Sequence, residues 1–131
     1  MEKLTELNFA DQAEQVIKSL IRTNNRSGKQ ELKPSNSQIR NLLELTTNLY
    51  NHARKEKTDV LSTDIQSDIQ YAKMKFAYAA GRDKDVKNFV EKSDLMNKVN
   101  AIKDSKAELM LFCKYMESLV AYHRFHGGSD R

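Results

Sequence analysis

The stretch TDIQSDIQYAKMKFAYAAG, residues 63–81, decides the fold. One set of its apolar residues recurs at helical spacing, which places them on one face of a helix. These residues are Ile65, Ile69, Ala72, Phe76, Ala79 and Ala80. Ser62 or Thr63 can accept backbone hydrogen bonds at the start, and Gly81 suits a left-handed cap at the end. The stretch therefore predicts an amphipathic helix from 63 to 81.

The same spacing continues on both sides of this helix. It predicts further helices at 8–24, 35–57, 84–93, 94–103 and 105–125. Ser35 or Ser37 can cap the second helix and Asp104 or Ser105 the last, which stops at Gly127 and Gly128. The polar segment 24–34, with Gly28 and Pro34, reads as a linker. We expect an all-α, compact bundle of five to six helices.

The domain organisation follows from length and from the linker. A chain of 131 residues fits one domain. We expect a single helical domain over 1–131, in which 1–34 is an N-terminal helix with a basic linker and 35–128 is the helical core.

Composition limits the compartment and the partners. The mean hydropathy is −0.72, 31% of the residues are charged, and no apolar run approaches the ~18 residues of a membrane span. The first residues lack the pattern of a signal peptide, and the single Cys113 reads as a small buried residue in a reducing compartment. We therefore expect a soluble, cytoplasmic protein that has no membrane partner.

The last predicted helix has two apolar faces. One face suits a bundle core and holds Leu109, Phe112, Cys113, Met116, Leu119, Val120 and His123. A second face, roughly 140° round, holds Leu111, Tyr115, Ser118, Tyr122 and Phe125. The second face is either covered by other helices of the same chain or is a surface for a protein partner, for which tyrosine and phenylalanine are well suited.

In helix 63–81, Tyr71, Met74 and Tyr78 form a similar outer stripe. The candidate protein-interface residues are Tyr71, Tyr78, Leu111, Tyr115, Tyr122 and Phe125.

Basic and amide side chains form stripes beside the apolar faces. The helix 35–57 carries Arg40, Thr47, Asn51 and Arg54 within about 60° of arc, and helix 63–81 carries Gln66, Gln70 and Lys73, followed by Arg82, Lys84 and Lys87. Such groups donate to phosphate oxygens without reading bases. The candidate RNA-backbone residues are Arg40, Asn51, Arg54, Lys73, Arg82, Lys84 and Lys87. The alternative is that these are ordinary solvated helix faces, which the acids at 83, 85 and 91 favour. The linker cations Arg22, Arg26, Lys29 and Lys33 can contact nucleic acid or serve solubility.

The strong signatures of catalysis are missing from the sequence. There is no HExxH, no phosphate-binding GxxxxGK[ST], no GxSxG and no zinc-ligand cysteine pair. His123 and His126 stand at i, i+3, but His123 falls on the core face and reads as a hydrogen-bonded interior histidine, whereas a cation at His126 suits the helix end. We expect no enzyme, no metal site, no cofactor and no small-molecule substrate.

Two strings carry a resemblance: IQYAKMKFAYAAGRDKDVKNFVEK, residues 69–92, and FCKYMESLVAYHRFHGG, residues 112–128. Both resemble the small-subunit family of the type III-A CRISPR (Csm) effector complex, and NSQIRNLLELTTNLYN, residues 36–51, resembles the helix that precedes them in that family. The resemblance implies a non-catalytic role in antiviral defence, with several copies lining up beside guide-bound backbone subunits.

The resemblance also implies partners. They are other Csm subunits, further copies of the chain, guide RNA and target RNA, with a positive face along the RNA that would map onto Arg40, Arg54, Lys73, Arg82 and Lys87. The competing hypothesis is a helical adaptor or homodimer without nucleic-acid contact.

Overall fold

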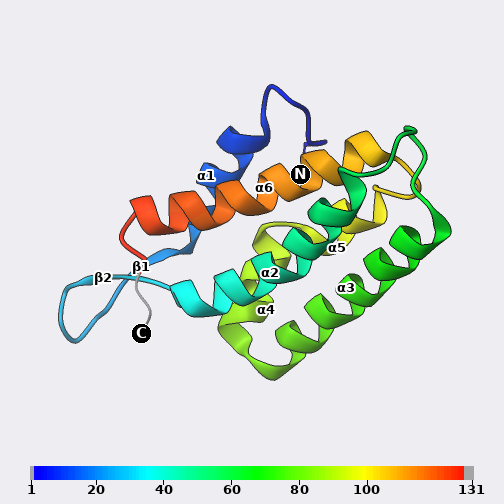
Figure 1. Cartoon of the computed structure of the whole chain (residues 1–131). Coiled ribbons are helices and arrows are strands. Elements are labelled where there is room, and N and C mark those ends of the chain that lie inside the picture. The colour runs from blue at the N-terminus through cyan, green and yellow to red at the C-terminus, as the bar shows by residue number, and fades with distance from the viewer. Residues whose placement is uncertain (1, 129–131) are drawn as a thin grey trace.

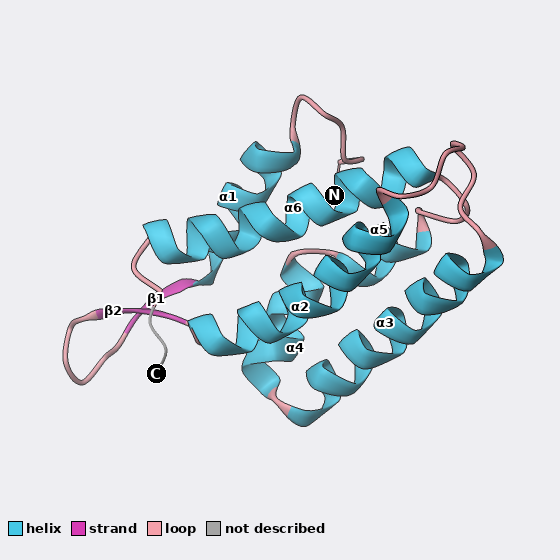
Figure 2. Ribbon diagram, in the orientation of Figure 1, coloured by secondary structure: helices cyan, strands magenta, loops and turns pink. Residues whose placement is uncertain are grey.

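The computed structural model describes residues 2–128, and this part of the chain forms six helices and two short strands (Figure 1). The elements are α1 (Phe9–Leu20), β1 (Ile21–Thr23), β2 (Gln30–Leu32), α2 (Asn36–Ala53), α3 (Thr63–Arg82), α4 (Lys84–Lys92), α5 (Leu95–Asn100) and α6 (Lys106–Phe125). The mostly helical fold that the periodicity predicts is confirmed. The small antiparallel sheet is an addition to it (Figure 2).

Serine side chains set the starts of three helices. At α2, the hydroxyl of Ser35 accepts a hydrogen bond from the backbone of Gln38 at 3.2 Å, and the Gln38 side chain accepts one from the Ser35 backbone at 2.9 Å. This reciprocal pair is a capping box, which satisfies two otherwise unpaired N–H groups. Ser62 caps α3 and Ser105 caps α6, and each serine side chain accepts a single hydrogen bond from a backbone N–H group. Each of these serines is one of the two alternatives that the sequence offers.

The prediction that Gly81 ends the third helix in a left-handed conformation is wrong. The helix α3 continues through Gly81 to Arg82, and Asp83 then adopts an extended conformation with φ −147°. Asp83 Oδ1 accepts hydrogen bonds from the backbone N–H groups of Asp85 at 2.8 Å and Val86 at 3.1 Å. Because this carboxylate caps the start of α4, the chain turns the corner without a left-handed residue.

The prediction of helix up to residue 24 is also wrong, and the linker predicted over 24–34 contains a short strand. The helix α1 ends at Leu20, and β1 and β2 then pair as an antiparallel hairpin. Asn24 Oδ1 accepts hydrogen bonds from two backbone N–H groups of the turn, at 2.9 and 3.3 Å, and Gly28 supplies a positive φ of 71°. A side chain that satisfies its own turn in this way competes with the helix. The hairpin extends beyond the helical body (Figure 1).

The long helices lie side by side around α6. α6 packs between α1 and α2, α3 lies along α2, and α4 and α5 both contact α3 (Figure 1). The apolar residues that the periodicity assigns to helix faces meet in one connected core. Its largest fully buried side chains include Phe76, Phe89, Phe112, Tyr115, Met116 and Leu119. The loop before α3 is tied to the loop before α6 by a backbone hydrogen bond of 2.8 Å from Leu61 to Asp104.

Candidate nucleic-acid interface

The basic stripe of α2 is exposed as the sequence predicts. Arg40, Asn51 and Arg54 are all exposed, and none of them has an ion pair or a side-chain hydrogen bond within residues 2–128. At 1.5 Å per residue, Arg40 and Arg54 stand about 21 Å apart along the helix axis. The residues of α2 that face α3, among them Gln38, Leu45 and His52, lie on a different side of the helix. The stripe is therefore separate from the α2–α3 groove.

A second basic group stands at the corner between α3 and α4. Arg82, Lys84 and Lys87 are exposed there. The corner is held against the start of α2 because Gln38 Nε2 donates a hydrogen bond to Asp83 Oδ2 at 3.0 Å. Hydrogen bonds from the backbone of Val86 above all, together with those from Asp85 and Gln38 and the charge of Lys84, hold the pKa of Asp83 below its usual 3.8. The corner thus carries three exposed cations next to a carboxylate, Asp83, that is fixed by hydrogen bonds.

The groove between α2 and α3 changes character along its length. At the Arg82 end, a hollow of about 240 Å³ is lined by Gln38, Asn41, Leu42, Ala79, Arg82, Asp83 and Val86. At the other end, a hollow of about 280 Å³ includes His52 and Asp68, whose Nδ1 and Oδ2 atoms lie 3.5 Å apart. Arg82 and the acid Asp83 thus line one end of the groove, and His52 and Asp68 line the other.

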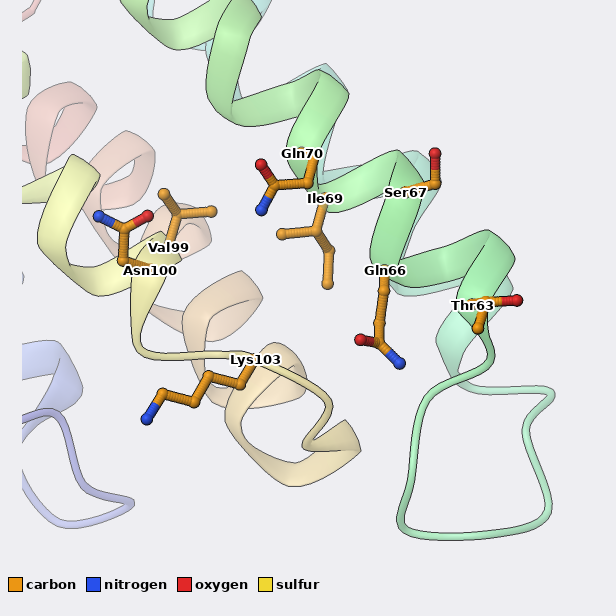
Figure 3. A pocket seen from close by; sticks show the side chains of 8 residues that line it. All are labelled: Thr63, Gln66, Ser67, Ile69, Gln70, Val99, Asn100 and Lys103. Carbon is orange, nitrogen blue, oxygen red and sulfur yellow. The ribbon is translucent and has the colours of Figure 1, made fainter.

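Lys73 does not join Arg82 on one face. Nine residues separate the two, which places them about 180° apart around α3. Lys73 is half-buried and continues the strip of Gln66 and Gln70, which line a different groove between α3 and α5 (Figure 3). The strip of Gln66, Gln70 and Lys73 therefore lies on a different side of α3 from Arg82, because the helix runs on through Gly81.

The aromatic stripe of α3 lies on the surface. Tyr71 is 58% exposed, Met74 53% and Tyr78 63%. Cations lie over both rings, with Lys75 Nζ 5.2 Å from the Tyr71 ring and the Arg82 guanidinium 5.5 Å from the Tyr78 ring. The result is an exposed apolar stripe with positive charge beside it.

The second face of α6 is divided between core and surface. Leu111 and Tyr115 are buried inside the chain, and the Tyr115 hydroxyl donates to the backbone oxygen of Ser93 at 2.8 Å. Their assignment to an exposed protein interface is therefore wrong. The physical reason is that α1 packs against α6 and that the end of α4, at Ser93, contacts Tyr115.

The C-terminal end of the same face stays accessible. Phe125 is 75% exposed, and Tyr122 is half-buried with its ring edge-on to Phe125 at 6.4 Å. Of the six residues expected at a protein interface, four thus have exposed or partly exposed side chains: Tyr71, Tyr78, Tyr122 and Phe125.

The three reactive side chains considered in the sequence, His123, His126 and Cys113, make contacts within the fold. His123 is buried, and its Nε2 donates to the Pro34 carbonyl at 2.8 Å, which confirms the interior hydrogen-bonded histidine. His126 Nε2 lies 2.9 Å from Glu14 Oε2 of α1. Burial raises the pKa of Cys113 to about 12, with a further contribution from Glu117. Between residues 2 and 128, no three histidine, cysteine, aspartate or glutamate side chains converge as metal ligands.

Sequence reasoning missed the residues that face Gln66 and Gln70. Asn100 of α5 and Lys103 of the following turn line the same groove, although more than 30 residues separate them from Gln66. No local pattern could pair these segments, because the pairing depends on how α3 packs on α5. None of the described helices combines the length and the apolar character of a membrane span.

Comparison with known proteins identifies the family of the chain. The family model described as Csm2 Type III-A matches residues 13–129. A protein of Streptococcus thermophilus named CRISPR system Cms protein Csm2 is 39% identical over 127 residues, covering 97% of this chain and 98% of the relative. Proteins of the same name from Enterococcus italicus and Mycobacterium tuberculosis are 34% and 35% identical. The former alignment covers 98% of this chain and 94% of the relative, and the latter 72% and 77%. The chain therefore belongs to the Csm2 family of type III-A CRISPR systems.

Proposed function

We propose that the chain is a non-catalytic small subunit of a type III-A CRISPR ribonucleoprotein effector. It packs beside the backbone subunits and further copies of itself, and it contacts the phosphate backbone of the guide–target RNA duplex without base specificity. Its basic side chains neutralise phosphates, and cleavage belongs to other subunits. Membership of the Csm2 family and the names of its relatives support the assembly. The RNA contact rests on the arrangement of charge.

The observation that carries the RNA contact is a set of exposed cations that form no ion pair within residues 2–128. Arg40, Arg54, Lys84 and Lys87 have no ion pair in the described part of the chain. Arg82 contacts a tyrosine ring rather than a carboxylate. A cation whose charge is not already neutralised gains more from a phosphate, because binding releases a counterion from the nucleic acid.

The spacing of the cations suits a strand rather than a single small anion. Arg40 and Arg54 are about 21 Å apart along α2, which corresponds to several nucleotides at roughly 3.4 Å rise each. Asn51 stands between them and adds a neutral donor. Contacts of this kind fix the position of a backbone and carry no base information.

Charge reversal in the assembled complex tests the RNA contact. We expect Arg54→Glu and Arg82→Glu each to weaken retention of target RNA, and each to lower the slope of log affinity against log salt by about one. The loss is the same for targets of different base composition. Lys18→Glu, an exposed change on α1, is the matched control and leaves the slope unchanged. Unaltered RNA retention by both variants in fully assembled complexes contradicts the proposal.

A second candidate is an adaptor that binds protein alone. The exposed stripe of Tyr71, Met74 and Tyr78 favours it, because large tyrosine surfaces are typical of protein interfaces. A homodimer would retain Tyr122 and Phe125 as contacts, since Leu111 and Tyr115 are buried. Sedimentation of the isolated chain measures self-association directly. An adaptor predicts that Arg54→Glu and Arg82→Glu complexes assemble and hold RNA normally.

A further inference from the structure

The hairpin of β1 and β2 ends in a polar tip, NNRSGKQ, residues 24–30. This tip holds two cations, Arg26 and Lys29, and it contains no acid and no apolar side chain. Both cations are exposed, and neither side chain has an ion pair or a hydrogen bond within residues 2–128. Because the hairpin extends beyond the helical body, the tip is accessible to a large ligand (Figure 1).

The backbone of the tip is ordered by hydrogen bonds within the hairpin. The Asn24 N–H donates to the Lys29 carbonyl at 2.7 Å, and the Gly28 N–H donates to the Asn24 carbonyl at 2.8 Å. The Asn24 side chain accepts from two N–H groups of the turn, and its Nδ2 donates to Glu31 Oε1. The acid of β2 is therefore engaged at the root of the tip. A ligand that binds the tip does not have to order its backbone first, which lowers the entropic cost of binding.

The root of the hairpin is joined to the helical body at two points. Arg22 Nη2 of β1 lies 3.6 Å from Asp85 Oδ1 in the first turn of α4. After β2, the Pro34 carbonyl accepts the hydrogen bond from His123 at 2.8 Å. Asp85 belongs to the corner of α3 and α4, which is itself held to the start of α2 through Gln38. The tip, the basic corner and the first turns of α2 therefore lie at the same end of the molecule (Figure 1).

We propose that the hairpin tip is a second contact for RNA phosphates. Arg26 and Lys29 bind the backbone of the RNA whose other phosphates meet the basic corner and Arg40. The guanidinium of Arg26 can donate to two phosphate oxygens at once, and Lys29 acts as a point charge. The inference rests on the proposed RNA contact and adds to it a segment that lies outside the helices.

The composition of the tip favours RNA over a protein partner. The buried centre of a protein interface is built from apolar and aromatic side chains and is depleted of charge. The tip offers none of these side chains, and its cations are accompanied by the neutral donors Ser27 and Gln30. Arginine, lysine, serine and glutamine are the residue types that contact phosphates without reading bases. A second copy of the chain or another subunit would find no apolar surface to bury there.

Removal of the two charges tests the contact. The full chain is titrated into a fluorescently labelled RNA duplex at several salt concentrations, and fluorescence anisotropy reports binding. We expect the double change Arg26→Gln, Lys29→Gln to weaken binding about tenfold and to lower the slope of log affinity against log salt by about two, one for each phosphate contact. Lys18→Gln, an exposed lysine of α1, is the matched control and leaves both quantities unchanged. Urea unfolding of the double variant is expected to match that of the parent, because both side chains are exposed.

A second pair of variants tests the order of the tip without changing its charge. Asn24→Ala removes the side-chain hydrogen bonds that hold the turn, and we expect binding of the same duplex to weaken about threefold, because the loop must then be ordered on binding. The salt slope stays the same. Asn25→Ala is the matched control, since Asn25 is exposed and its side chain has no hydrogen bond within residues 2–128. Equal affinities of the two variants overturn the role of the ordered turn.

The same titrations separate the hairpin contact from the proposed function. If the Arg26, Lys29 double variant binds the duplex like the parent while Arg54→Glu weakens binding, the hairpin contact is wrong and the proposed function stands. If both variants bind normally, the proposed RNA contact is wrong as well. A labelled acidic peptide of the same charge as the duplex serves as a second probe. Tighter binding of this peptide than of the duplex, lost in the double variant, would assign the tip to an acidic protein and overturn the inference.

Discussion

The imidazole of His123 joins the end of α6 to the start of α2 by donating from Nε2 to the Pro34 carbonyl oxygen at 2.8 Å. Its other nitrogen, Nδ1, is buried and has no hydrogen-bond partner within residues 2–128. Burial lowers the pKa of His123 below 6.5 and the nearby charge of Arg124 lowers it further, although the Pro34 contact acts in the opposite direction. The histidine therefore serves the fold in its neutral form.

Stability should fall when the solution is made acidic. Because the folded-state pKa is lowered, the unfolded chain binds a proton at His123 first as pH drops below 6.5. The contribution of His123 to the free energy of unfolding is therefore complete above pH 6.5. It decreases as the pH falls toward the folded-state pKa and does not change further below it. Urea unfolding at closely spaced pH values measures this.

The loss of stability at low pH in this interval should arise from His123 alone. Replacement His123→Gln keeps a donor for the Pro34 carbonyl and removes the titration, so the slope in that interval flattens. His52→Gln serves as the control, because the His52 side chain is exposed at the end of the α2–α3 groove and its pair with Asp68 is at the surface. A slope that persists in His123→Gln but disappears in His52→Gln would contradict the assignment.

Two glycines should respond to alanine in opposite directions. A methyl group at Gly128 would overlap Nδ1 and Cε1 of His123, whereas one at Gly81 meets nothing within 4 Å. We expect Gly128→Ala to cost about 2–3 kcal/mol by overpacking. Gly81→Ala should stabilise the chain by about 0.5–1 kcal/mol, because alanine is favoured inside a helix. Chemical denaturation of both variants is the measurement, and the same sign for the two would contradict the different surroundings of Gly81 and Gly128.

Tyr115 contributes a buried hydrogen bond that phenylalanine cannot make. Its hydroxyl donates to the Ser93 oxygen at 2.8 Å, and burial above all raises its pKa, so the proton stays on the phenol. Tyr115→Phe leaves a buried carbonyl without this donor, and we expect a loss of about 1–2 kcal/mol in unfolding free energy. Tyr78→Phe, at an exposed ring, should stay within about 0.5 kcal/mol of the parent. Equal losses for the two would contradict the internal role of Tyr115.

How well the sequence predicts each element of this fold depends on how far apart along the chain the interacting residues are. Serine caps and apolar spacing act within one helix, so α2, α3 and α6 could be predicted together with their starts at Ser35, Ser62 and Ser105. The hairpin of β1 and β2 could not, since three-residue strands are too short to show alternation. Its Ile21 also continues the apolar spacing of α1.

The sequence could predict which residues of the candidate site are exposed. It could not predict as well which of them lie on the same face. Exposure of Arg40, Arg54 and Arg82 follows from their position beside an apolar helix face. The separation of Lys73 from Arg82 depends on α3 running on through Gly81, which a glycine near a helix end does not reveal. Burial of Leu111 and Tyr115 depends on the packing of α1 over α6. The sequence offered that arrangement as one of two open explanations.

The aromatic stripe of α3 gives a test of assembly that is independent of RNA. Tyr71 and Tyr78 are exposed and no hydrogen bond of their hydroxyls occurs within residues 2–128, so the double change Tyr71→Ser, Tyr78→Ser should leave the free energy of unfolding within about 0.5 kcal/mol. If the stripe packs against a neighbouring subunit, the same change removes a large buried area at that contact and lowers the amount of the chain that co-purifies with the complex. Lys75 and Arg82 remain in place, which keeps the charge constant. Normal incorporation of the double variant would place the subunit contact elsewhere, and Phe125→Ser at the end of α6 would then be the variant that loses assembly.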